Sequence, residues 1–190
     1  MMANKRRGGR APAAGETNAE IILRRRNRAL DRQGYISLAL RVLGLAAVLW
    51  VLFTQVFLIT QASGNDMFPS VKDGDLVLCF RLQRGYVKDD VVIYTADGRE
   101  HIGRVAAVAT DYVMLDDSGS LLVNGTDQSG EILYPTYAKD GQAYPYQVPE
   151  NAVFLLGDYR TQATDSRDYG AVLLSDVKGK VITILRRRGL

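Results

Sequence analysis

A run of nineteen residues, Val42–Thr60, carries no charged side chain, and Gln55 is its only strongly polar residue. At ~1.5 Å per residue, a helix of this length spans roughly 29 Å, which is enough to cross a bilayer. We therefore expect one transmembrane helix, with residues 35–62 as the anchor. A cleaved signal peptide is the alternative, because the small residues Ala62, Ser63 and Gly64 would suit cleavage, although the apolar region of a signal peptide is normally shorter.

Charge is distributed unevenly along the chain. Residues 1–41 contain ten Lys and Arg and three acidic side chains, a net charge of +7, whereas the remainder carries −4. A basic flank before an apolar span is typical of a cytoplasmic segment that faces anionic lipid. The sequence therefore predicts a single-pass cell-membrane protein with a cytoplasmic N-terminus and an extracytoplasmic C-terminal domain. Membrane lipid is the expected partner of the anchor, and nucleic acid is not expected.

The basic segment, residues 1–34, is predicted to be a cytoplasmic tail. Residues 1–16 lack periodicity and read as disordered. A short helix is expected from Thr17 or Asn18 to about Asp31, with a break or bend at Gly34. This helix is either a positive-inside signal alone or a helix that lies on the lipid surface.

Residues 63–190 alternate short apolar runs with turn residues, which predicts a β domain. The predicted strands are Leu76–Phe80, Val91–Tyr94, Ile102–Val108, Tyr112–Leu115, Leu121–Val123, Val153–Leu156 and Val181–Leu185. The fold class is therefore mainly β, a single transmembrane helix followed by an all-β barrel or packed-sheet domain. Residues 126–150, rich in Tyr and Pro, form either a loop that covers one end of the domain or an aromatic docking surface.

The chain has one cysteine, Cys79, and one histidine, His101. An internal disulfide is therefore excluded, and an ordinary metal cage built from these ligands is not expected. We predict no metal and no other cofactor.

Four motifs follow the apolar run. They are Asp66-Met67-Phe68-Pro69-Ser70, Gly74-Asp75-Leu76-Val77, Asp90–Tyr94 with His101–Val105, and Gly157–Arg160 with Asp165–Gly170. In this order they resemble the motifs of the type I signal peptidase family, S26, and Leu122–Gly125 resembles its Val-Asn-Gly turn. The resemblance implies a membrane anchor followed by an all-β catalytic domain.

The resemblance also implies a serine–lysine dyad, in which a serine attacks the peptide carbonyl and a buried lysine accepts its proton. The serine position holds Asp66, and the lysine position holds Gly103. The position of the oxyanion hydroxyl holds Gly64, with Ser63 beside it, and the serine that orients the lysine is replaced by Ala163. We therefore predict that no catalytic residue is functional. Four residues remain as a structural signature: Asp158, Arg160, Asp165 and Arg167.

His101 lies two residues before Gly103, on the same face of a strand, and is predicted to approach Asp66. A base without a nucleophile has nothing to activate. An aspartic dyad of Asp66 with Asp158 or Asp165 is another alternative. We expect a remnant cleft that binds an extended peptide, lined by Asp66, Met67, Phe68, Pro69 and His101.

Aspartate in place of serine, combined with glycine in place of lysine, is similar to the signal-peptidase-like proteins of sortase-assembled pili in Gram-positive bacteria. That resemblance implies a non-catalytic accessory or chaperone protein in pilus assembly, with a pilin subunit or a sortase as its partner. Two other interpretations stay open. One is an active signal peptidase I that processes exported preproteins, and the other is an exported β domain with an unrelated binding role.

Overall fold

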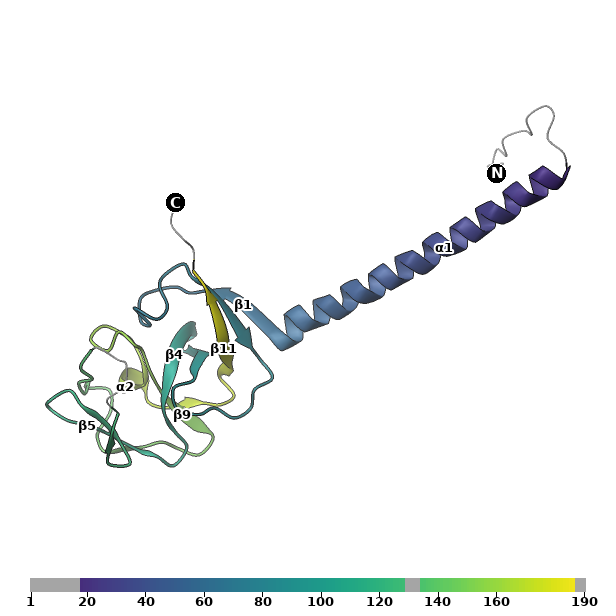
Figure 1. Cartoon of the computed structure of the whole chain (residues 1–190). Coiled ribbons are helices and arrows are strands. Elements are labelled where there is room, and N and C mark those ends of the chain that lie inside the picture. Colours follow the sequence, from purple (N-terminus) through teal and green to yellow (C-terminus); the bar gives the residue numbers. More distant parts are fainter. Residues whose placement is uncertain (1–17, 129–133, 187–190) are drawn as a thin grey trace, which may run out of the picture. The chain divides into compact units, whose positions relative to one another are not determined.

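The structure, a computed structural model, describes residues 18–128 and 134–186. The chain divides into a helical unit up to Trp50 and a β unit from Val51 onward (Figure 1). Helix α1, Asn18–Val51, forms the described part of the helical unit, extends one residue beyond it and continues into a π-helical turn, η1, Leu52–Val56. Within the described residues, one helix, Gln33–Val56, is long and apolar enough to cross a membrane, and no residue of its apolar window is buried in the protein.

Two details of the helix differ from the sequence prediction. The expected break at Gly34 is wrong, because α1 runs through it without interruption. A glycine inside a helix costs only about 1 kcal/mol, which the many helix formers around it offset. The predicted transmembrane helix also ends early, because Phe57 adopts an extended conformation and begins a strand within the apolar run.

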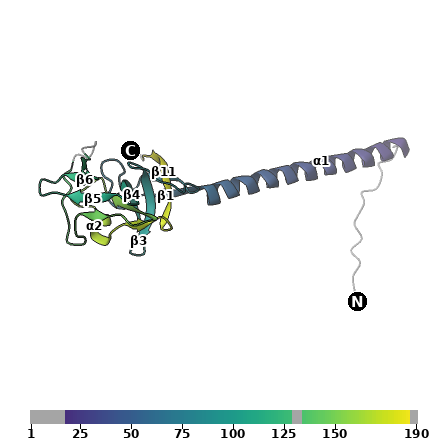
Figure 2. The same ribbon diagram turned by 90° about the horizontal axis from the view of Figure 1, so that it is seen from below.

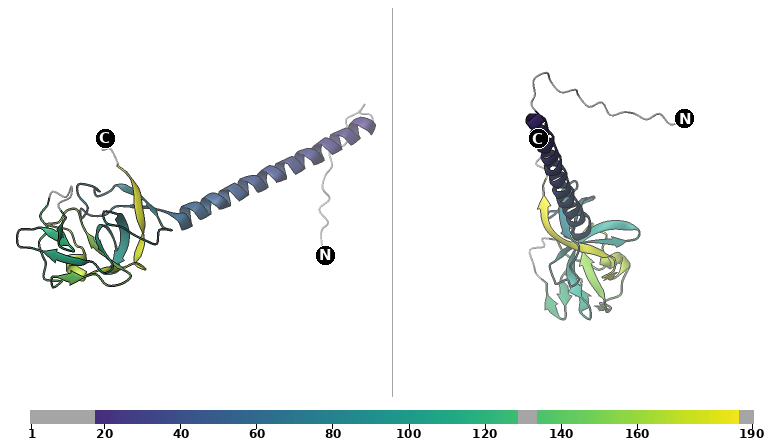
Figure 3. Two further views of the ribbon diagram at one scale, coloured as in Figure 1. Left: turned by 60° about the horizontal axis from the view of Figure 1, so that its bottom comes forward. Right: turned by 90° about the vertical axis from the view of Figure 1, so that its right-hand side faces the viewer.

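The β unit contains two antiparallel sheets. The larger sheet has the order β1-β2-β11-β3-β4-β9-β10, and the smaller sheet has the order β7-β6-β5-β8. The strands of the larger sheet are β1 Phe57–Gln61, β2 Leu76–Phe80, β3 Val91–Ala96, β4 Arg99–Val108, β9 Ala152–Leu156, β10 Val172–Leu173 and β11 Val177–Leu185. Those of the smaller sheet are β5 Tyr112–Leu115, β6 Leu121–Val123, β7 Thr126–Asp127 and β8 Tyr146–Gln147. Strands β5 and β6 lie on the opposite side of the β unit from β1 and β11 (Figures 2 and 3).

The mainly-β prediction is confirmed, and each predicted strand is present. The sequence prediction missed β1, β7, β8 and β10, together with the four-residue helix α2, Ser166–Tyr169. Strand β1 was missed because its residues continue the apolar run, and it becomes a strand by pairing with β2 from Phe57↔Phe80 to Gln61↔Leu76. The other three strands are two residues long and have no detectable alternation.

A two-residue hairpin sets the register of the strands that carry the site. Asp97 and Gly98 both have positive φ, 48° and 73°, as a type I′ turn requires. This turn pairs Ala96 with Arg99 and therefore places Tyr94 opposite His101. A slip of one residue would move every side chain to the other face. The turn chemistry thus decides which side chains can meet in the site.

The core is continuous around β9, whose five residues are all buried. Phe154 and Leu156 pack into a cluster with the smaller sheet, whereas Val153 and Leu155 pack into a cluster on the other face with Tyr94. Both faces of β9 are covered, which explains why it reads as an unbroken apolar run.

The outer face of β1, β2 and the end of β11 is also apolar. Register places Phe57 beside Phe80, with ring centroids 5.8 Å apart, and Ile59 in line with Leu78. The exposed residues of this outer apolar face include Ile59, Leu76, Ile182 and Leu185. The opposite face of the same strands carries the buried residues Val77 and Cys79. An apolar surface therefore begins one residue after the helix ends.

Candidate functional site

The turn that carries Asp66 joins β1 to β2 and is anchored by the buried side chains of Met67 and Val71. Met67 is 3% exposed and packs into the core cluster beneath β2. The amide of Phe68 donates to the carbonyl three residues earlier, and the amide of Val71 donates to the carbonyl of Met67, each at 2.9 Å. Phe68 is half-buried, the Phe68–Pro69 peptide bond is cis, and Pro69 is exposed. The anchored turn leaves the Asp66 carboxylate partly exposed.

Strand β4 brings His101 to this carboxylate. His101 Nδ1 lies 3.9 Å from Asp66 Oδ2, and the two side chains are 15% and 33% exposed. That separation allows an ion pair if the imidazole is protonated, but it is too long for a hydrogen bond. The imidazole stacks on the ring of Tyr94, with centroids 5.6 Å apart and planes 26° apart. His101 is therefore held between a carboxylate and an aromatic ring.

Gly103 is buried two residues further along β4, and the Tyr94 ring lies over it. A Cβ at this position would lie 3.0 Å from Tyr94 Cε1, 3.4 Å from Leu155 Cβ and 3.5 Å from the Tyr94 hydroxyl. The first contact is tighter than ordinary van der Waals separation, so any side chain here requires the ring to move by a few tenths of an ångström. The phenol thus occupies space into which a side chain at 103 would extend.

A pair of phenols restrains that ring. The hydroxyls of Tyr94 and Tyr169 are 2.5 Å apart, and the two ring centroids are 6.4 Å apart. Tyr94 is 1% exposed. Burial, as the first cause, raises the pKa of both phenols above the usual range for tyrosine, since a buried phenolate lacks solvation. Both hydroxyls therefore stay protonated and neither is a base at neutral pH.

Gly64 and Ala163 lie at the other two positions that depart from the motifs. Gly64 is exposed, has φ +85°, and its amide donates to Asp73 Oδ1 at 2.9 Å. Ala163 is fully buried and packs on Gly157, where a Cβ would lie 2.3 Å from Ala163 Cβ and 2.6 Å from the Asp66 carbonyl oxygen. Glycine at 157 therefore permits the last motif to approach the Asp66 turn, and Ala163 fills the adjoining space without a polar group.

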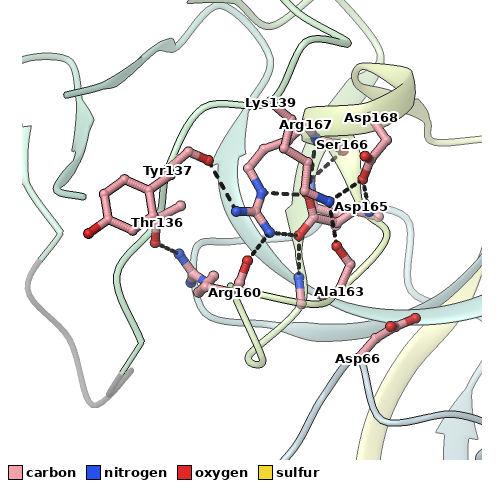
Figure 4. Close-up of polar contacts among 12 residues, drawn as sticks. Asp66, Thr136, Tyr137, Lys139, Arg160, Ala163, Asp165, Ser166, Arg167 and Asp168 are labelled. Carbon is pink, nitrogen blue, oxygen red and sulfur yellow. Dashed lines mark hydrogen bonds and ion pairs between the residues drawn. The ribbon is translucent and has the colours of Figure 1, made fainter. Parts of the chain in front are cut away.

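Three of the four signature residues form ionic contacts, and Figure 4 shows the pair between Asp165 and Arg167. Arg167 donates to Asp165 through Nε and Nη2, each at 2.8 Å. Asp158 instead accepts two hydrogen bonds from Arg104 on β4, at 2.8 and 2.7 Å. Burial lowers the pKa of Arg160 to about 10, and its Nη1 donates to Thr136 Oγ1 at 2.8 Å. These pairs join the last motif to β4 and to the loop before β8.

The aspartic-dyad alternative finds no support in this geometry. Each of the other two carboxylates already has an arginine partner, and Asp165 also caps α2 by accepting from the amide of Arg167. Asp165 further accepts from the amide of Gly157 at 3.1 Å. Neither Asp158 nor Asp165 is left to share a proton with Asp66.

The described part of residues 126–150 packs against the last motif. Arg167 Nη1 donates to the Tyr137 carbonyl at 3.2 Å, and Lys139 Nζ donates to the Ala163 carbonyl and to Asp168 Oδ2, each at 2.6 Å. Figure 4 shows these side chains converging on the α2 region. These contacts favour the loop-cover interpretation for this part of the segment, although Tyr137 itself is 49% exposed.

The family model described as signal peptidase, peptidase S26, matches residues 32–185. The chain belongs to the S26 signal peptidase family. The match includes each of the four motifs and the end of β11.

Two relatives found by sequence agree with this assignment. A probable thylakoidal processing peptidase 2 of Arabidopsis thaliana is 32% identical over 132 residues, which is 62% of this chain and 35% of the relative. Signal peptidase I of Bacillus caldolyticus is 28% identical over 134 residues, covering 62% of this chain and 73% of the relative. A crystal structure of a signal peptidase I from Enterococcus faecalis superposes with a TM-score of 0.45 and 23% identity, covering 52% of this chain and 97% of that one. The match to the plant relative thus spans about a third of that protein's length.

Within the S26 motifs, the side chains present differ chemically from those of a serine–lysine dyad. Asp66 supplies a carboxylate where the family resemblance places a hydroxyl nucleophile, and Gly103 supplies no amine. The buried hydroxyl of Ser166 is already engaged, because it accepts a hydrogen bond from the Leu155 amide at 2.9 Å. These side chains can hold a positive charge beside Asp66, and an apolar side chain of a bound peptide can pack on Phe68.

Sequence reasoning missed three participants in this site: Tyr94, Tyr169 and Lys139. The Asp97-Gly98 turn, which pairs the strands so that Tyr94 lies opposite His101, was a usable signal for the first of these. No sequence signal pointed to Tyr169 or Lys139, because their contacts join segments 75 and 29 residues apart.

Proposed function

We propose that this S26 family member is a non-catalytic, membrane-anchored factor that binds an extended peptide during the assembly of extracytoplasmic proteins. The observation that carries the proposal is the pairing of Gly103 with Tyr94. A buried glycine stands at the position of the general base, and an aromatic ring held by Tyr169 lies over it. Acyl transfer needs both a nucleophile and a group that accepts its proton.

The proposed peptide site is the surface around the Asp66 turn. Its members are the residues expected from the motif: Asp66, Met67, Phe68, Pro69 and His101. Met67 supports the turn from the core, whereas Phe68, Pro69 and Asp66 are at least partly exposed. A turn anchored from beneath gives a rigid surface on which a bound chain loses little free energy to reorganisation of the protein.

We extend the proposal to pilus assembly, with a pilin subunit or a sortase as the partner. The support is the combination of Asp66 and Gly103 in an S26 chain, which resembles the pilus-associated members of the family. Genes for pilins and sortases beside this gene would strengthen the extension. Co-purification of a pilin with the wild-type chain, lost on replacing Phe68 with Asp, would test it directly.

An active signal peptidase remains the second candidate, because family membership and the relatives named as peptidases favour it. The decisive experiment incubates the full chain in proteoliposomes with a preprotein and measures cleavage at the signal-peptide junction. An active signal peptidase I is the positive control. We expect no cleavage by the wild-type chain.

Restoring the dyad provides a second arm of this test. The double variant Asp66→Ser/Gly103→Lys should remain inactive, because Gly64 and Ala163 still lack the hydroxyls that stabilise the oxyanion and orient the lysine. Junction-specific cleavage by the wild-type chain that disappears in Asp66→Ala or His101→Ala would overturn the non-catalytic proposal.

We further propose that residues 1–34 are a cytoplasmic tail, that residues 35–62 include the anchor, and that the domain from residue 63 lies outside the cytoplasmic membrane. The support is the basic segment before the apolar helix and the outer apolar face that starts at Phe57. An apolar sheet face directly after a membrane helix suits the interface of the bilayer. Protease added to intact protoplasts should digest the β domain, and digestion only after lysis would reverse the proposed orientation.

A further inference from the structure

The Asp66 carboxylate lacks a close partner. Within residues 18–128 and 134–186, the only cationic side chain at ion-pair distance is His101, at 3.9 Å. The carboxylates of Asp158 and Asp165, by contrast, each receive two charge-assisted hydrogen bonds of 2.8 Å or less from an arginine. Asp66 is therefore a partly exposed carboxylate within the proposed peptide surface, and among the described residues its one ion-pair partner is His101.

Two groups of aromatic rings belong to the segments that form this site. His101, whose Nδ1 lies 3.9 Å from Asp66 Oδ2, stacks on Tyr94, and Tyr94 contacts Tyr169. The second group contains Phe68, whose ring centroid lies 5.9 Å from that of Tyr159. The Tyr159 amide also donates to the Asp66 carbonyl at 2.9 Å, which joins this second group of rings to the turn.

The second aromatic group extends beyond Tyr159. The ring of Tyr134 lies 4.8 Å from the ring of Tyr159, and both are half-buried. A cation is already present on this group, because Lys72 Nζ lies 5.8 Å from the centroid of Phe68. The ring of Phe68 is thus oriented so that an ammonium group can approach it.

A partly exposed carboxylate in a turn that also carries the ring of Phe68 suits the recognition of an organic cation. The carboxylate supplies Coulomb attraction, and the ring faces accept the same charge through their quadrupoles. A neutral or anionic side chain would lose both contributions, and an anionic one would also be repelled by Asp66. Replacement of a hydroxyl by a carboxylate at this position therefore changes the charge that the surface accepts.

We propose that Asp66, together with the ring of Phe68 in the same turn, binds a cationic side chain, lysine or arginine, of an extended peptide lying on the turn. This inference rests on the proposed function and adds the substrate class to it. The residue at the nucleophile position becomes the specificity-determining residue. A pilin or other assembly substrate would then be recognised by a lysine or arginine within an otherwise apolar segment.

The test uses the full chain in nanodiscs and a capped, fluorescein-labelled peptide, Ala-Thr-Val-X-Val-Thr-Ala. X is lysine, arginine, norleucine or Nε-acetyl-lysine, and binding is measured by fluorescence anisotropy. We expect the lysine and arginine peptides to bind about fivefold to tenfold more tightly than the norleucine peptide, as one partly exposed ion pair with ring contacts would provide. A difference between lysine and arginine would identify which cation the surface prefers.

Two variants locate the effect. Asp66→Asn keeps the shape of the side chain and should remove the preference, so that the lysine and arginine peptides bind no more tightly than the norleucine peptide. Asp117→Asn, an exposed aspartate in the turn between β5 and β6, is the matched control and should retain the full preference. A preference that survives Asp66→Asn overturns the inference.

The outcomes also separate this inference from the function on which it rests. Equal binding of the lysine and norleucine peptides refutes cation recognition and leaves a non-catalytic peptide-binding protein. Failure of each of the four peptides to bind overturns the cation site. Cleavage of a bound peptide, seen by mass spectrometry, overturns the non-catalytic function, whereas the cation preference is still decided by the affinities.

Discussion

Replacing Gly103 with alanine should destabilise the protein, although the same replacement stabilises many strands. Removing glycine alone would restrict the unfolded chain and contribute roughly 0.4–1 kcal/mol of stability. Here the new Cβ meets Tyr94 Cε1 at 3.0 Å and Leu155 Cβ at 3.4 Å in a buried site. Overpacking of this kind typically costs about 1–3 kcal/mol. We therefore expect a net loss of about 1–2 kcal/mol.

The prediction is checked by thermal and urea unfolding of the full chain in detergent. A loss of this size should lower the midpoint temperature by about 2–8 °C. Gly85→Ala is the matched control, because its Cβ would meet nothing within 4 Å and its backbone has no positive φ. It should change stability by no more than about 0.5 kcal/mol.

A double variant tests whether the Tyr94 ring is the cause. Tyr94→Phe removes the hydrogen bond to Tyr169 and lets the ring shift away from position 103. Gly103→Ala in that background should then cost less than in the wild type, a coupling of about 0.5 kcal/mol or more. Gly103→Ala that is as stable as Gly85→Ala would refute the argument that the Tyr94 ring occupies the space beside position 103.

Two other side chains give sharp expectations. Burial raises the pKa of Cys79 to about 11 from an ordinary value of 9.0. The contribution of the protonated thiol to stability is therefore complete below about pH 9 and is lost as the pH rises toward 11. Over that range the unfolding free energy of the wild type should fall more steeply than that of Cys79→Ala, and parallel curves would contradict this. Arg167→Met leaves the buried Asp165 carboxylate without its cation and should lower the unfolding free energy by about 3–5 kcal/mol. Arg99→Met, at an exposed position, is the control. Equal midpoint temperatures for the two variants would refute a structural role for the Asp165–Arg167 pair.

The sequence alone determined the family, the mainly β fold class and the chemistry missing from the motifs. These properties are local. A motif is a set of side chains at short spacing, and the alternation of a strand can be recognised within a few residues. The departures at Asp66, Gly103, Gly64 and Ala163 were visible for the same reason, because each is defined by its offset from a neighbouring motif residue.

Only the tertiary structure decided where the helix ends and what surrounds the departed positions. Phe57–Gln61 belongs to the apolar run by composition and becomes strand β1 only because β2, fifteen residues later, supplies the hydrogen bonds. The Tyr94–Tyr169 pair, 75 residues apart, likewise depends on distant segments meeting. Asp158 pairs with Arg104 on β4, 54 residues away, although Arg160 lies much closer in sequence. Local spacing restricts which residues can be strand neighbours. Contacts between distant segments depend instead on how the whole sheet packs, and that packing places the Tyr94 ring over Gly103.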